Sequence, residues 1–189
     1  MAQEIEMESK NLLTETEYNK LFNYLELTPN QIKQQTNYYF ETPDFQLKAH
    51  GAALRIRVKD GQWQLTLKEP YQNGLLETHD HLTADEAEKW LSNQLIPKPH
   101  VKKQLNNMGI TFESLNYGGA LKTDRIETPY KQALVVIDYS VYNNTFDYEL
   151  EVESETKEKS EAVLLELIEQ LNISKKPTKN KIERFYETL

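Results

Sequence analysis

Several stretches of the chain place charged side chains at every second residue. Residues 6–10 (Glu-Met-Glu-Ser-Lys) alternate two carboxylates and an ammonium group with smaller or apolar residues. Residues 55–57 (Arg-Ile-Arg) present two guanidinium groups, and residues 149–153 present three carboxylates. Successive side chains of a β-strand point to opposite faces, so each of these charged sets is expected to share one face of its strand.

Acids and bases concentrated in this way suggest a metal-bound phosphate ligand. Neighbouring carboxylates on one strand face repel one another unless a cation lies among them. Hard divalent ions such as Mg²⁺ bind carboxylate oxygens together with water and phosphate oxygens. Arginine supplies planar pairs of donors for phosphate, and lysine adds a point charge. The alternative is an ordinary half-buried sheet whose charged face is solvated. We favour charged faces that point into a closed barrel, where a low dielectric strengthens each contact.

The segments that must position these residues alternate with period two or are rich in β-branched and aromatic residues. They predict strands at 4–10, 36–42, 53–59, 63–69, 75–81, 120–128, 133–139 and 147–154. Capping boxes at 14–17 and 83–86 are each followed by apolar residues at helical spacing, which predicts two helices. Residues 159–171 predict an amphipathic helix, and 101–108 suggest a shorter one. No Gly/Ser linker divides the chain. We therefore predict an α+β fold: one domain over 1–189, an eight-stranded antiparallel closed barrel with helices packed outside.

Composition narrows the classes of function. The 189 residues include no cysteine, which excludes disulfides and thiolate metal sites. Thirty acids against 22 bases give a net charge of −8, which argues against a broad nucleic-acid surface. The longest apolar run, residues 133–137, is too short to span a membrane, and the acidic N-terminus does not resemble a secretory signal. We expect a cytoplasmic protein with no nucleic-acid or membrane partner.

These motifs resemble the CYTH superfamily, or triphosphate tunnel metalloenzymes, which includes class IV adenylate cyclases and several triphosphatases. Residues 6–10 match the family's Glu-x-Glu-x-Lys hallmark. An Arg-x-Arg strand (55–57), a lysine that ends the next strand (Lys68) and a late Glu-x-Glu strand (149–151) follow in the family's order. Residues 38–45 look like the family's aromatic-Asp-Thr segment, with Glu41 in place of the usual aspartate. The pattern is most similar to a short, single-domain bacterial branch often named as adenylate cyclases.

The resemblance implies an eight-stranded tunnel that binds a triphosphate, and it assigns roles to particular residues. Glu6, Glu8, Glu149 and Glu151 would bind a divalent metal, Mg²⁺ or Mn²⁺. The phosphate oxygens would be bound by basic residues: Lys10, Arg55, Arg57, Lys68 and Arg125. Glu6, Glu8, Lys10 and Arg57 would be the catalytic core.

Further residues have weaker assignments. Lys179, Lys181 and Arg184, near the C-terminus, match basic residues that reach the tunnel in relatives, although a solvated helix face is at least an equal alternative. Glu77, Asp138 and Glu153 are additional acidic candidates, each with a structural alternative. His79 and His81 would share a strand face beside Glu77, but a zinc site there is disfavoured.

Three functions remain open at this point. The first is metal-dependent hydrolysis of inorganic triphosphate or of a small organic or nucleoside triphosphate. The second is an adenylate cyclase on the same scaffold, ranked lower because the sequence identifies no adenine pocket. The third is a non-catalytic barrel that binds an anionic ligand, which two carboxylate sets argue against. The sequence fixes neither the substrate, nor Mg²⁺ against Mn²⁺, nor the oligomeric state, for which a homodimer is left open.

Overall fold

The computed structural model describes residues 2–189, and its strands pair in an order that closes on itself. The hydrogen-bonded order is β1-β5-β4-β3-β2-β6-β7-β8, a closed barrel. The neighbouring pairs whose register is known are antiparallel. The strands are β1 (Gln3–Leu13), β2 (Lys33–Glu41), β3 (Ala53–Lys59), β4 (Gln62–Tyr71), β5 (Gly74–Leu82), β6 (Asn116–Tyr130), β7 (Ala133–Tyr142) and β8 (Thr145–Ser154). The predicted eight-stranded antiparallel barrel is confirmed.

Short turns fix the register of the hairpins. Asp60 and Gly61 join β3 to β4 with φ of 51° and 73°, a left-handed pair typical of a two-residue hairpin. Asn143 and Asn144 join β7 to β8 in the same region, with φ of 44° and 61°. Asparagine and glycine tolerate this conformation better than other residues do. A slip of one residue would move the charged set of a strand to its other face, so these turns also fix the site.

The helices include those that the sequence predicts and two that it does not. Thr14 and Thr83 form the predicted capping boxes with Glu17 and Glu86. The four-residue α2 and the C-terminal α6 were not predicted. The α-helices are α1 (Glu15–Tyr24), α2 (Gln46–Ala49), α3 (Ala84–Leu91), α4 (Pro99–Asn107), α5 (Lys157–Gln170) and α6 (Lys181–Glu187); 3₁₀ turns occupy Pro29–Gln31 and Phe112–Ser114.

Two compact units divide the described chain. Unit 1 comprises residues 2–5 and 35–121, and unit 2 comprises 6–34 and 122–189. In unit 1 the apolar sides of the central strands, such as Leu54 and Leu65, pack with Trp90 of α3 and Leu105 of α4. Trp90 meets Phe40 edge-on, with ring centroids 5.1 Å apart. The single domain over 1–189 stays a prediction.

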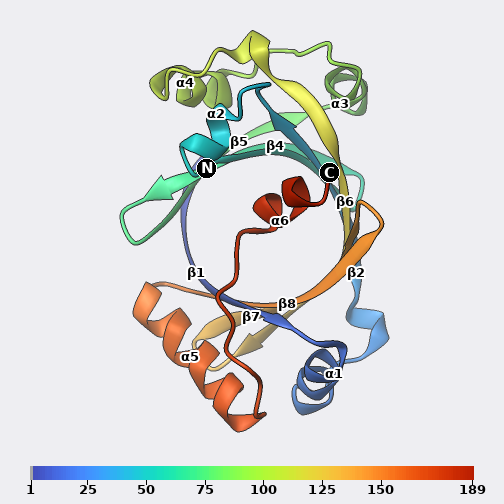
Figure 1. The fold of residues 1–189 in the computed structure, drawn as a ribbon, viewed down its shortest axis with the longest axis vertical. Helices are drawn as coiled ribbons and strands as arrows, with labels where there is room; N and C mark the ends of the chain where they lie inside the picture. The colour runs from blue at the N-terminus through green and yellow to red at the C-terminus, as the bar shows by residue number, and fades with distance from the viewer. Residues whose placement is uncertain (1) are drawn as a thin grey trace. The chain divides into compact units, whose positions relative to one another are not determined.

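Unit 2 has its own core on one face of β7 and β8. Ile137 and Leu150 pack there against Leu21 of α1 and Leu164 and Leu167 of α5. Each fully buried aliphatic side chain stabilises the fold by roughly 1.5–3 kcal/mol. Figure 1 shows α5 and α1 on this side of β7 and β8, whereas α6 lies on the opposite side. The face opposite this core is therefore covered by α6.

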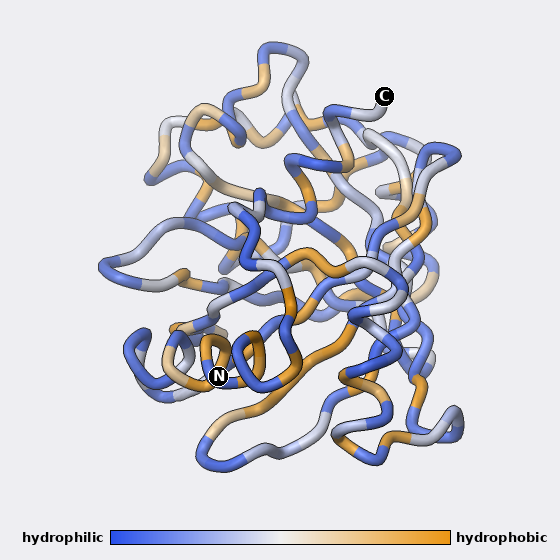
Figure 2. Tube along the Cα trace, turned by 60° about the horizontal axis from the view of Figure 1, so that its bottom comes forward, coloured by the Kyte–Doolittle hydropathy of each residue, from blue (hydrophilic) through white to orange (hydrophobic). Residues whose placement is uncertain are grey.

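Alternation of polar and apolar residues separates the two faces of each sheet. Figure 2 shows hydrophilic and hydrophobic segments following one another along the chain. The apolar residues of β3, Leu54 and Ile56, are fully buried in the core, while Arg55 and Arg57 lie on the other face. Among residues 2–189, no helix combines the length and apolarity needed to cross a membrane.

Candidate functional site

The register of unit 2 brings its acidic residues onto one face. Glu8 lies opposite Glu153, and Lys10 lies opposite Glu151, in the β1–β8 ladder. On the other side of β8, Glu149 pairs with Asp138 of β7. Asp138 pairs in turn with Arg125 of β6. Cross-strand pairs are close enough for direct contact, so the strands themselves assemble this set.

This acidic face is buried. Asp138 and Glu149 have no exposed surface, and Glu8 and Glu151 are 9% and 7% exposed. Acidic residues are almost never buried to this degree unless they are paired. The alternative of a solvated outer face is therefore wrong for these four residues.

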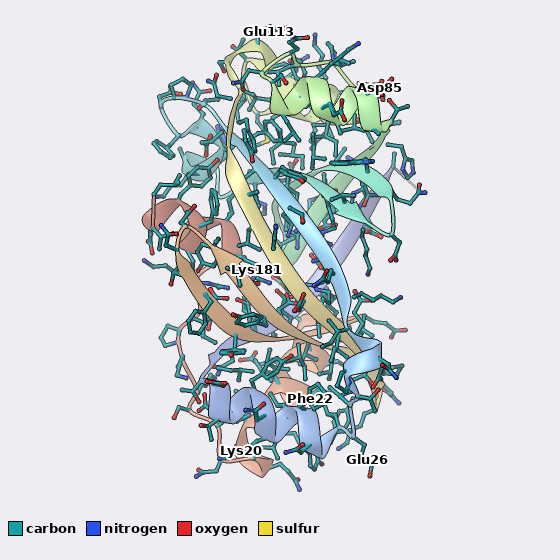
Figure 3. The ribbon with its side chains drawn as sticks, turned by 90° about the vertical axis from the view of Figure 1, so that its right-hand side faces the viewer. Lys20, Phe22, Glu26, Asp85, Glu113 and Lys181 are labelled. Atoms are coloured by element: carbon teal, nitrogen blue, oxygen red, sulfur yellow. The ribbon has the colours of Figure 1, made fainter. Side chains whose placement is uncertain are left out.

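Three cations bind the innermost carboxylates, Asp138, Glu149 and Glu151. Arg125 Nη2 lies 2.6 Å from Asp138 and 2.9 Å from Glu151. Lys181 Nζ of α6 lies 2.5 Å from Asp138, 3.4 Å from Glu149 and 3.3 Å from Glu151. Figure 3 labels Lys181 beside the strands of this unit.

A further α6 residue, Arg184, completes this ion-pair network. Its guanidinium forms an ion pair with Glu149 and a hydrogen bond from Nε to Asp147, 2.9 Å away. Because α6 supplies both Lys181 and Arg184, its position over the acidic face is tied to these ion pairs.

Burial and charge drive the pKa values of neighbouring carboxylates apart. Burial raises the pKa of Glu149 to about 8, and the neighbouring Lys181 and Arg184 lower it only in part. Burial also acts on Glu151, but Lys181 and Arg125 outweigh it and hold its pKa well below the ordinary range. These opposite directions indicate that Glu149 takes up a proton more readily than Glu151.

A second acidic group, Glu6, Glu8 and Glu153, fits a divalent ion. One oxygen from each carboxylate lies within 4.8 Å of the others. Burial and the negative charges of Glu6 and Glu151 together raise the pKa of Glu153 to about 7. Lys10 Nζ lies 2.7 Å from Glu8. An all-oxygen donor set whose members repel one another is the kind that Mg²⁺ or Mn²⁺ binds.

Unit 1 presents a polar face of different character. Arg55 pairs with Thr66 and Arg57 with Gln64 across β3 and β4, and Lys68 pairs with Glu77 across β4 and β5. Glu77 Oε1 lies 3.0 Å from Lys68 Nζ and 3.5 Å from Arg55 Nη2.

The cations around Glu77 keep it ionised despite its burial. Burial would raise the pKa of Glu77, but Arg55, Lys68 and His79 outweigh it and lower the pKa to about 2. A carboxylate held charged in this way fixes the directions of the basic side chains that it binds. Within unit 1, basic groups therefore gather around one ionised acid.

The predicted site residues fall into these two faces, with one exception. Unit 2 brings together Glu6, Glu8, Lys10, Arg125, Asp138, Glu149, Glu151, Glu153 and Lys181. Unit 1 brings together Arg55, Lys68 and Glu77, with Arg57 on the same strand face as Arg55. Lys179 is the exception, since its side chain is 61% exposed and its ammonium group pairs with Glu187.

The structure gives specific contacts to two residues that sequence reasoning had left without a defined partner. Arg184 was grouped with Lys179 and Lys181 as a C-terminal basic residue, and the structure shows its partner, Glu149. It stands three residues after Lys181, a spacing that puts both on one helix face. Glu41 was noted only as a departure from a family motif. Its carboxylate accepts hydrogen bonds from the backbone N–H groups of Thr42, Leu47 and Lys48, so it caps the start of α2.

Comparisons with known proteins agree with this geometry. A model of the CYTH domain family matches residues 4–186. The chain is 42% identical over 187 residues to a Bacillus subtilis (strain 168) protein named "Putative triphosphatase YjbK", an alignment that covers 99% of this chain and 97% of that protein.

Solved structures with the same fold have been described as both cyclases and triphosphatases. A crystal structure described as "a putative adenylate cyclase" from Bacillus halodurans is 38% identical, with a TM-score of 0.94, and the match covers 98% of this chain and 100% of that one. A Hippeastrum protein, described as a "putative adenylyl cyclase" with a dominant triphosphatase activity, is 19% identical with a TM-score of 0.77. The match covers 97% of this chain and 95% of that one. At that identity the second likeness shows the fold alone.

Proposed function

Because the chain belongs to the CYTH domain family, we propose that it is a metal-dependent hydrolase of a triphosphate. The substrate class is inorganic triphosphate or a small organic or nucleoside triphosphate. The observation that supports this most is the pair of all-carboxylate groups on the buried face of unit 2, each close enough to surround an ion. A simple anion receptor has no use for so many acids, whereas a metal-bound triphosphate needs both acids and bases.

The four proposed metal ligands divide between the two acidic groups. Glu6 and Glu8 belong to one, which Glu153 completes, and Glu149 and Glu151 belong to the other, which Asp138 completes. The family implies a divalent ion, and we propose Mg²⁺ or Mn²⁺ because both accept oxygen ligands. When bound, such an ion polarises a phosphoryl oxygen and so favours attack at phosphorus.

The basic residues then bind and orient the phosphate chain. Arg55, Arg57 and Lys68 of unit 1 donate to phosphate oxygens, and Arg57 is oriented by a bond from its Nε to Asn37 Oδ1, 2.8 Å away. In unit 2, Lys10 is oriented by Glu8 and by Asn180 Oδ1, each 2.7 Å from its Nζ. Arg125 and Lys181 add positive charge to that face. Side chains held in this way stabilise developing negative charge without reorganising.

Lys179 stays in the proposal as a peripheral phosphate ligand. Its exposed ammonium group would bind phosphate only after leaving Glu187. We rank it below the other bases for that reason.

Cyclisation of ATP is the second candidate, favoured by the name of the Bacillus halodurans relative. It requires the same phosphate contacts, but the ribose 3′-hydroxyl would attack the α-phosphorus in place of water. Hydrolysis needs no base pocket and no positioned hydroxyl, and the 42% identical relative is named for that activity. Hydrolysis is therefore the better supported of the two.

Product analysis tests the proposal. Phosphate release from tripolyphosphate is measured with Mg²⁺ and with Mn²⁺, and the products from ATP are separated by chromatography. ADP and phosphate indicate hydrolysis, whereas cyclic AMP and pyrophosphate indicate the cyclase. Glu6→Ala and Arg57→Ala are expected to abolish most of the turnover. Wild-type activity in either variant would contradict its assigned role, and tight binding of tripolyphosphate without metal and without turnover would indicate a binding protein.

A further inference from the structure

His79 of β5 lies between the two acidic side chains of unit 1. Its Nε2 is 2.9 Å from Glu4 Oε1 and 3.4 Å from Glu77 Oε2. Carboxylate oxygens of ionised acids only accept hydrogen bonds, so the proton must be on Nε2. The imidazole therefore donates to Glu4 and lies beside Glu77 Oε2, so it links β1 to the charged cluster around Glu77.

The ring of His79 is fixed on its other edge and through its backbone. Nδ1 lies 2.9 Å from Thr66 Oγ1, the residue directly opposite on β4. The backbone N–H of His79 donates to the carbonyl of Ala2, 2.8 Å away. The ring is 10% exposed, so packing restricts it as well. Contacts from β1 and β4 thus leave the imidazole little freedom to turn.

The two oxygens of Glu77 have different partners. Oε1 lies near Lys68 and Arg55, at 3.0 and 3.5 Å, and Oε2 is the oxygen next to His79. A carboxylate can rotate about its last torsion angle unless both oxygens are engaged. His79 engages Oε2 and thereby holds Oε1 toward the two basic side chains.

Given the triphosphatase activity proposed above, we propose that His79 is a positioning residue for the phosphate-binding bases of unit 1. It acts through Glu77, fixing the carboxylate that orients the Lys68 ammonium group and the Arg55 guanidinium before phosphate arrives. Bases oriented in advance lose less conformational entropy when the ligand binds. Because the ground state and the transition state benefit alike, His79 lowers KM more than it raises kcat.

Three variants test this role. His79→Ala removes the ring, His79→Gln retains an N–H donor at a similar reach, and Thr66→Val removes the contact that holds the ring. With tripolyphosphate and Mg²⁺, His79→Ala should raise KM by about 3- to 10-fold and leave kcat within about two-fold. His79→Gln should restore most of the substrate affinity, with a KM close to that of the wild type. Thr66→Val should also raise KM, but by less than His79→Ala does. Glu88→Gln, an exposed acid on α3, is the control.

Calorimetric titration with tripolyphosphate separates this proposal from the proposed function. If the wild type binds but does not turn over, the hydrolase assignment fails, while weaker binding by His79→Ala and its recovery in His79→Gln still support the positioning role. An unchanged KM and an unchanged affinity in His79→Ala overturn it. A fall in kcat with KM unchanged would also overturn it. The same holds for a loss of affinity that His79→Gln does not restore.

Discussion

Lys181 of α6 lies 2.5 Å from Asp138 of β7, a carboxylate with no exposed surface. The same ammonium group reaches Glu149 and Glu151 of β8. These acids raise the pKa of Lys181 strongly, although its burial acts in the opposite direction. The C-terminal helix is thus joined to the acidic face by a lysine that stays charged.

Replacing Lys181 should destabilise the fold far more than replacing Lys179. Lys181→Met leaves Glu149 and Glu151 with fewer buried partners, and loss of one partner of a buried pair typically costs about 3–5 kcal/mol. Because Arg125 still pairs with Asp138, we expect the loss of unfolding free energy to lie toward the lower end of that range. Lys179→Met, two residues away, removes only an exposed ion pair and should leave unfolding unchanged. Urea unfolding at pH 7 measures both, and equal effects would contradict a special role for Lys181.

The strands of this fold were predictable because alternation is a local signal. Arg55 and Arg57 against Leu54 and Ile56 already specify a strand with one charged and one apolar face. The start of β6 was missed, because residues 116–119 contain two glycines and no alternation, yet the strand begins at Asn116. Its pairing there is a tertiary effect that the local sequence does not encode.

The helix that completes the acidic face was not predictable in the same way. α6 has seven residues, too few to be stable alone, and packing holds it through Phe185, which is fully buried. The sequence did indicate which residues were acids and bases. Which cation binds which acid depends on contacts such as Lys181 with Asp138, 43 positions apart, and the fold alone decides these.

Glu8→Gln should weaken the binding of a divalent ion, while the metal-free protein stays folded. The substitution removes one charge from the group formed with Glu6 and Glu153 while it retains the size of the side chain. Loss of one carboxylate ligand should reduce Mn²⁺ affinity by at least about 10-fold, because hard cations depend on ligand charge. Glu155→Gln is the control, since its side chain is 85% exposed. Calorimetry with Mn²⁺ measures both, and equal affinity in the two variants would contradict this site.

Arg57→Lys should lose activity almost as fully as Arg57→Ala. Lysine keeps the charge but lacks the planar pair of donors, and it cannot keep both the contact with Asn37 and a two-point contact with phosphate. We expect kcat/KM for tripolyphosphate to fall by about 10- to 100-fold in Arg57→Lys, which corresponds to roughly 1.4–2.7 kcal/mol. Lys103→Ala, an exposed change on α4, serves as the reference. Activity retained in Arg57→Lys and lost in Arg57→Ala would mean that charge alone suffices.

Glu17 should make the stability of unit 2 depend on pH. Its carboxylate accepts hydrogen bonds from the backbone N–H groups of Thr14 and Ser174 and from Lys176 Nζ, at 2.7, 2.9 and 3.0 Å. It therefore caps α1 and also ties down the segment that leads to α6. Burial would raise the pKa of Glu17, but these hydrogen bonds and the Lys176 charge outweigh it and lower the pKa from 4.5 to about 2.

Because the pKa of Glu17 is lower in the folded state, its contribution is present above about pH 4.5 and is lost as the pH falls toward 2. Glu17→Gln should cost about 1.5–3 kcal/mol at pH 7, the range for hydrogen bonds to a charged group. The difference from the wild type should shrink between pH 4.5 and 2, as urea unfolding at a series of pH values would show. Glu15→Gln shares the first turn of α1 but is exposed, so it controls for the helix dipole. If the difference in unfolding free energy stayed constant with pH, or if Glu15→Gln reproduced it, the effect would belong to the helix itself. The contacts with Ser174 and Lys176 would then not be its cause.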